Sequence, residues 1–137
     1  NFEIEVFKIL SFLSGTMIPG NFLSSENDLM IPNELIKERV YFLDSNIYRA
    51  DVVGVSTDGS ELVIEVIGAY LPNGGNPILS RLEKFKENIS NSKVWLIVFG
   101  EVPDFFKDRV IEMNLFLTDI EGWKKIKGLV SEKSDEN

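Results

Sequence analysis

The chain has 137 residues with 14 basic and 22 acidic side chains, which give a formal net charge of −8 at pH 7. A hydrophobic content of 44% over this length is typical of one globular domain and excludes a disordered chain. Cysteine and histidine are both absent, which excludes disulfides, zinc sites with thiolate or imidazole ligands and Ser-His-Asp catalysis, so hydrolytic chemistry must use carboxylates, lysine, arginine and metal ions.

Residues 2–13 are predicted to form the first element, an amphipathic helix that ends at Gly15. A long connection with Pro19, Gly20 and Pro32 then covers residues 16–37, and loops of this length are often functional or mobile. The first strand is predicted over residues 39–43, and a turn over residues 44–46 leads into a hairpin.

The hairpin consists of two segments rich in β-branched residues, 47–55 and 61–67, joined by a turn that contains Asp58 and Gly59. A type I turn closed by Gly59 in the left-handed conformation pairs residues whose numbers sum to about 116. Asp51 then lies opposite Glu65, with Cβ atoms about 5 Å apart. Strand alternation predicts one face with Arg49, Asp51, Val53, Val63, Glu65 and Ile67. It predicts an apolar core face with Val52, Leu62, Ile64 and Val66.

Two carboxylates at this distance repel one another unless a cation lies between them. Asp51, Glu65, a backbone carbonyl such as that of Val66, and water would form an oxygen-rich shell suited to Mg²⁺ or Mn²⁺. The alternative is that both acids lie on a solvated sheet face without a function.

Asp51, the hairpin and the segment Glu65-Val66-Ile67 resemble the PD-(D/E)xK nuclease superfamily, whose members share a restriction-endonuclease-like core. The resemblance covers the chain from the first helix to about Thr118, and in size and element order it extends to small archaeal nucleases, including Holliday-junction resolvases. It implies an α/β fold with a mixed central sheet flanked by helices, and metal-dependent hydrolysis of DNA.

The resemblance also implies roles for single residues. Asp51 and Glu65 match the two motif acids, and Glu3 matches a glutamate of the first helix that reaches the metal site, with Glu5 as a less suitable substitute. An acid in the first turn of a helix also has the simpler role of stabilising the helix dipole. Ile67 occupies the position where the superfamily has a lysine, which orients the nucleophile and adds positive charge near the transition state.

Three cations could replace that lysine. Arg49 is expected opposite Ile67 and beside Asp51, and Arg81 or Lys84 could reach the acids from the next helix. Alternatively, Arg49 forms a salt bridge that neutralises the acids, and no metal is needed.

Residues 68–77 are predicted to form a glycine-rich loop that serves as a flap or an interaction loop. A helix follows from Pro77 to about residue 89, then a buried strand over 93–99, a helix over 102–113, a strand over 115–118 and a last helix from Asp119. Residues 1–130 are expected to form a single nuclease-like domain, and residues 131–137 a frayed tail.

Three functions fit these observations: a metal-dependent DNA endonuclease, a catalytically inactive domain of the same fold that binds nucleic acid or protein, and an unrelated α/β module. Because no apolar segment is long enough to span a membrane, we expect a cytoplasmic protein without a membrane partner. The net charge of −8 counts against simple nucleic-acid binding. A homodimer through Tyr70 and Leu71, or a partner subunit, is also expected. Because the sequence starts at Asn1 without a methionine, we expect it to be a fragment of a longer protein.

Overall fold

The computed structural model describes residues 1–68 and 71–135. The helices are α1 (Phe2–Phe12), α2 (Asn76–Asn88), α3 (Asp104–Glu112) and α4 (Ile120–Asp135), with short 3₁₀ turns η1 (Gly20–Phe22) and η2 (Pro72–Gly75). The strands are β1 (Met17–Ile18), β2 (Leu29–Met30), β3 (Glu34–Leu43), β4 (Asn46–Val55), β5 (Glu61–Ile67), β6 (Ser92–Val98) and β7 (Phe116–Thr118). No helix among the described residues is both long and apolar enough to span a membrane.

The main sheet has five strands in the order β3-β4-β5-β6-β7. Strands β3, β4 and β5 are antiparallel neighbours, whereas β5, β6 and β7 run parallel and are connected through α2 and α3. The α/β class with a mixed, helix-flanked sheet is therefore confirmed. Strand β5, which contains Glu65, is the central strand.

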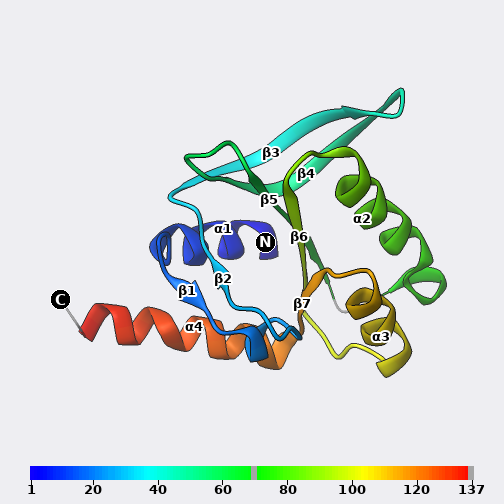
Figure 1. Cartoon of the computed structure of the whole chain (residues 1–137). Coiled ribbons are helices and arrows are strands. Elements are labelled where there is room, and N and C mark those ends of the chain that lie inside the picture. The colour runs from blue at the N-terminus through cyan, green and yellow to red at the C-terminus, as the bar shows by residue number, and fades with distance from the viewer. Residues whose placement is uncertain (69–70, 136–137) are drawn as a thin grey trace.

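Helices cover both faces of the sheet: α1 and α4 lie on one side, and α2 and α3 lie on the other (Figure 1). The core on the α1 side contains Val52, Ile64, Trp95 and Trp123, and the core on the α2 side contains Val53, Val63 and Phe85. Burial of this apolar surface is the main contribution to stability. The predicted apolar face of the hairpin is confirmed, since its four residues all belong to the α1-side core: Val52, Leu62, Ile64 and Val66.

Two predicted boundaries were wrong. Strand β3 begins at Glu34 rather than residue 39, because residues 34–37 pair with β4, and the preceding connection contains the small β1–β2 sheet. Helix α4 continues to Asp135, so residues 131–135 are helical rather than frayed. The ammonium of Lys133 donates to the carbonyl of Phe12, which ties this part of α4 to the end of α1.

The loop predicted over residues 68–77 falls partly outside the described residues, because residues 69 and 70 are not among them. The expected dimer contact through Tyr70 therefore lies outside the described part of the chain. Leu71 is half-buried and packs against the α2-side core.

The hairpin register is the predicted one. Val52 pairs with Ile64 and Val55 pairs with Glu61, and Gly59 adopts the left-handed conformation at φ 85°. The pairing of β4 with β5 ends at Val52, the residue next to Asp51, so the predicted pair of Asp51 with Glu65 is not part of the ladder.

The predicted grouping of side chains by face was wrong at one point. Tyr48 and Ala50 pack toward the α2 side, but so does Val53, which means that the strict alternation of β4 is interrupted between residues 50 and 53. Opposite this interruption, Glu38 of β3 has a φ of 57°, and Glu38 and Asp51 do not form a ladder pair although both flanking pairs do. Because its side chain contacts Glu3 of α1, Asp51 lies on the side of β4 opposite Ala50, and it does not share a face with Val53.

Candidate metal and catalytic site

Asp51 lies where β4 separates from β5. Its carboxylate oxygen Oδ2 accepts a hydrogen bond of 2.8 Å from the backbone N–H of Val66. The side chain thus takes the place of a backbone acceptor for an N–H in the central strand, which fixes its position. The group of Val66 that contacts Asp51 is therefore its N–H. Its carbonyl stays a predicted metal ligand.

Glu65 is buried, with 6% of its surface exposed, and lies between Asp51 and Arg81. The pKa of Glu65 is raised to about 9, with burial as the largest cause and the negative charge of Asp51 as the next, while Arg81 acts in the opposite direction. The Arg81 guanidinium is 3.5 Å from Oε1 of Glu65, and this oxygen has no hydrogen-bond partner among the described residues. A buried carboxyl oxygen without such a partner is costly unless a proton or a cation compensates it.

Glu3 reaches the same place from the first turn of α1, whose N-cap is Asn1. The Asn1 side chain accepts hydrogen bonds from the N–H groups of Glu3 and Ile4, and this capping holds the first turn in place. Burial raises the pKa of Glu3, and the charge of Asp51 and a hydrogen bond between the two side chains raise it further. Glu3, Asp51 and Glu65 therefore form one acid cluster, in which each glutamate contacts Asp51.

Glu5, the less suitable substitute for Glu3, has a different role. Its carboxylate accepts a hydrogen bond of 2.9 Å from the indole N–H of Trp123 and lies 3.4 Å from the ammonium of Lys127. These contacts bind α1 to α4 and leave Glu3 as the acid of the first helix that faces the hairpin.

The three candidate cations have separate positions. Arg81 contacts Glu65, donates a hydrogen bond to the carbonyl of Arg49, and lies over the rings of Tyr48 and Phe85 at 5.7 and 5.1 Å. Lys84 does not lie at the acid cluster, because its ammonium is 2.7 Å from the carboxylate of Asp44 in the β3–β4 turn. This exposed pair is the reason to drop Lys84 as a replacement for the motif lysine.

Arg49 is exposed and is paired with Val40 of β3 rather than with Ile67. It forms no ion pair with the described acids, so the neutralising salt bridge considered for it is not present there. Its charge nevertheless lowers the pKa of Glu3, which places it near the cluster.

Ile67 contributes an apolar wall beside the acids. It lines a cavity of about 320 Å³ together with Asn1, Phe2, Glu3, Val66 and Gly68. No lysine or arginine side chain among the described residues lines this cavity, so Arg81 and Arg49 are the candidate sources of the charge that a lysine would add.

The acid cluster is a candidate for binding a metal ion. Within residues 1–68 and 71–135, no three His, Cys, Asp or Glu side chains already converge as a metal site. The cluster nevertheless has the chemistry of one, because Asp51 and Glu65 offer carboxylate oxygens on adjacent strands and one of these oxygens is buried without a hydrogen-bond partner. Asp51 and Glu65 are therefore the residues that could hold Mg²⁺ or Mn²⁺, with Glu3 outside them.

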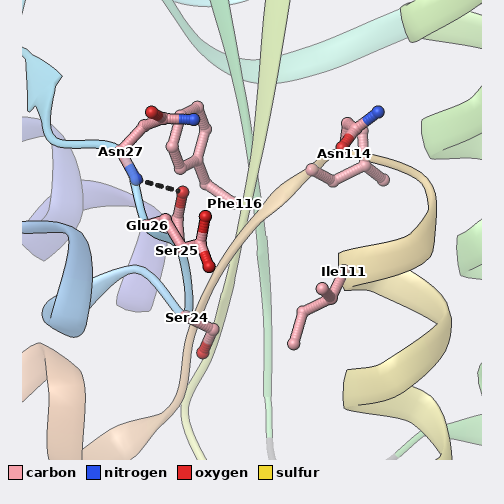
Figure 2. Close-up of a pocket in the computed structure, with 8 residues that line it drawn as sticks. Ser24, Ser25, Glu26, Asn27, Ile111, Asn114 and Phe116 are labelled. Carbon is pink, nitrogen blue, oxygen red and sulfur yellow. Dashed lines mark hydrogen bonds between the residues drawn. The ribbon is translucent and has the colours of Figure 1, made fainter.

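A second hollow, of about 460 Å³, lies away from this cluster, between the β1–β2 connection and the α3–β7 turn (Figure 2). Its polar lining includes Ser25, whose hydroxyl accepts a hydrogen bond from the N–H of Asn27, and Glu26 is its one titratable residue. With a single acid it lacks the paired charges expected of a catalytic site.

Sequence reasoning thus identified the acids, but it missed the Val66 N–H as the group that fixes Asp51 and the Asn1 cap that fixes Glu3. The Asn1 cap could have been found, since an asparagine directly before an apolar-periodic helix is a start signal.

No family model and no curated protein matches the chain. Among solved structures, the crystal structure of protein VC1899 from Vibrio cholerae is similar, with a TM-score of 0.57 and 17% sequence identity. The alignment covers 72% of this chain and 27% of that chain, so the chain matches about a quarter of the length of VC1899. At this identity the likeness concerns the fold alone.

Proposed function

We propose that this domain is a metal-dependent endonuclease with a restriction-endonuclease-like core, which hydrolyses phosphodiester bonds of DNA. The observation that carries the proposal is the buried Glu65 carboxyl, whose Oε1 has no hydrogen-bond partner in the described structure and which lies against Asp51. Two adjacent acids in a desolvated position are unfavourable for stability unless a cation is bound, and such arrangements are typical of functional sites. The central position of β5 and the element order support the same core.

In this proposal, Asp51 and Glu65 hold Mg²⁺ or Mn²⁺, and the carbonyl of Val66 is a further candidate ligand. The ion, when bound, supplies Lewis-acid stabilisation of the phosphate and an activated water. The chain's own residues orient the site: the Val66 N–H fixes Asp51, Arg81 fixes Glu65, and Glu3 adds an outer carboxylate.

Arg81 supplies the positive charge that the missing lysine would otherwise provide. Its guanidinium is held by the carbonyl of Arg49 and by two aromatic rings, so its position is fixed before substrate binds. Because an arginine stays protonated, Arg81 stabilises negative charge on the phosphate but does not transfer a proton. The loss of one such stabilising group costs about 10²–10³ in rate, so slow hydrolysis is expected.

A second candidate function is that of an inactive nuclease fold that binds nucleic acid or protein. The ion pair between Arg81 and Glu65 favours this function, because it offsets part of the negative charge of the acid cluster without a metal. The apolar Ile67 at the lysine position favours it too.

The test is calorimetric titration of Mn²⁺ into the wild type, Asp51→Asn and the control Asp108→Asn, which removes an exposed acid from α3. Stoichiometric binding that disappears only in Asp51→Asn, together with DNA nicking that disappears in the same variant, supports the endonuclease. Absence of Mn²⁺ binding to the wild type would exclude it and leave the inactive fold.

A further inference from the structure

The outer half of the β3–β4 hairpin exposes a group of apolar side chains that no other described element covers. Phe42 is 78% exposed, Ile47 is 68% exposed, and Val40 is 49% exposed. Phe42 and Ile47 are directly paired across the two strands, so their side chains are adjacent on one face of the ribbon. In Figure 1 this end of the hairpin projects beyond the helices.

The projecting end is held rigidly from its other face. Tyr41 and Tyr48 pack edge-on against Phe85 of α2, with ring centroids 5.9 and 6.0 Å away. The ion pair of Lys84 with Asp44 ties the turn itself to the same helix. Asp44 and Ser45 both have positive φ angles, 51° and 64°, as a two-residue hairpin turn requires. Phe42 and Ile47 are therefore presented to solvent on a fixed support.

The exposed pair lies in line with the acid cluster. Ile47, Arg49 and Asp51 alternate along β4 on the side opposite Tyr48 and Ala50. At roughly 3.3 Å per residue, Ile47 is about 13 Å from Asp51, and Arg49 lies halfway between them. Stacked bases rise about 3.4 Å per step, so this distance corresponds to about four steps of a duplex.

One cation beside the exposed pair is available to a polyanion, although the chain as a whole carries −8. Within residues 39–49, Arg39 is paired with Glu61 and Asp44 is paired with Lys84, whereas Arg49 forms no ion pair with a described acid. Aromatic and aliphatic side chains flanked by cations are the elements with which proteins separate stacked bases.

We propose that Phe42 and Ile47 form a wedge that enters between stacked bases of DNA bound at the acid cluster. The proposal rests on the proposed function, since the DNA is placed by the site at Asp51 and Glu65. The wedge unstacks the duplex about four steps from the bound phosphate, so the preferred substrates are sites where the stack is already weak, such as mismatches and branch points.

The experiment uses duplex DNA with a single 2-aminopurine, whose fluorescence increases when it is unstacked, in the presence of Ca²⁺. The wild type is compared with the double variant Phe42→Ala and Ile47→Ala. The matched control is Phe105→Ala and Ile111→Ala, which removes two exposed side chains of the same types from α3. We expect wild type and control to raise the fluorescence, and the hairpin variant to lose this rise and bind the DNA about tenfold more weakly.

Cleavage in Mn²⁺ and the molecular mass by light scattering are measured on the same proteins. Unstacking that depends on Phe42 and Ile47, without any cleavage, supports the wedge and refutes only the proposed hydrolysis. Cleavage by a wild type that produces no unstacking, or equal unstacking by the hairpin variant, overturns the wedge. Failure to bind DNA overturns it too, as does a wild-type dimer that the hairpin variant turns into a monomer, because a second copy then covers this face.

Discussion

The raised pKa of Glu65 has a direct consequence for the stability of the domain. The ordinary pKa of this side chain is 4.5 and that in the folded protein is about 9, so the folded state holds a proton that the unfolded state releases. The contribution of Glu65 to the free energy of unfolding is therefore largest below pH 4.5 and decreases as the pH rises toward 9. The slope is about 1.4 kcal/mol per pH unit, which amounts to about 4 kcal/mol over three pH units.

This decrease is measured as the free energy of urea unfolding between pH 5 and pH 8, in EDTA, for the wild type and Glu65→Gln. Glutamine is nearly isosteric and does not titrate, so the steep decrease should be absent in the variant. Glu26→Gln, which changes an exposed acid of the β1–β2 connection, should keep the wild-type slope. Equal slopes in the wild type and Glu65→Gln would refute the reasoning. If a metal binds at the cluster, Mn²⁺ should flatten the wild-type slope, since a bound cation favours the ionised carboxylate.

Four further predictions concern single residues. Ile67→Lys should raise Mn²⁺-dependent nicking of DNA by about 10²–10³; an unchanged rate in a folded variant would mean that another part of the site is missing. Arg81→Ala should bind Mn²⁺ more tightly in calorimetry, because it removes a cation that competes with the metal for Glu65. The same variant should nick DNA more slowly, because it removes a positive charge that stabilises the phosphate; weaker metal binding would contradict this role. Lys84→Ala should leave the nicking rate unchanged, because its ammonium contacts the β3–β4 turn, and a large loss of rate would place it in the site. Gly128→Ala should raise the Tm and add about 0.5–1 kcal/mol to stability, since a methyl group there meets no atom within 4 Å and alanine favours the helix; a lower Tm would contradict the open surroundings of this position.

Local signals were sufficient for the hairpin and for most of the fold. The Asp58-Gly59 turn correctly predicted the register in which Val52 pairs with Ile64, because turn geometry fixes pairing over the adjacent residues. The apolar segment of β6 was predicted as a strand buried on both faces because such a strand has no polar face to present.

The candidate site was predictable only in part. The acids Asp51 and Glu65 follow from that register, but the choice between Arg81 and Lys84 does not, because the two residues are one helical turn apart. The way α2 packs on the sheet directs Arg81 to Glu65 and Lys84 to Asp44. No local pattern encodes this packing angle.

The sequence alone therefore determined the α/β class, the hairpin register from Val52 to Glu61 and the choice of Asp51 and Glu65 as the acid pair, since alternation and turn chemistry act between near neighbours. Only the tertiary structure decided three features: the length of β3, the interrupted alternation of β4 beside Asp51, and the continuation of α4 past Lys133. Each of these depends on a partner distant in sequence: β4 for Glu34, Val66 for Asp51, and Phe12 for Lys133. Such contacts form only when the chain is folded, so their effect on local conformation cannot be read from local pattern.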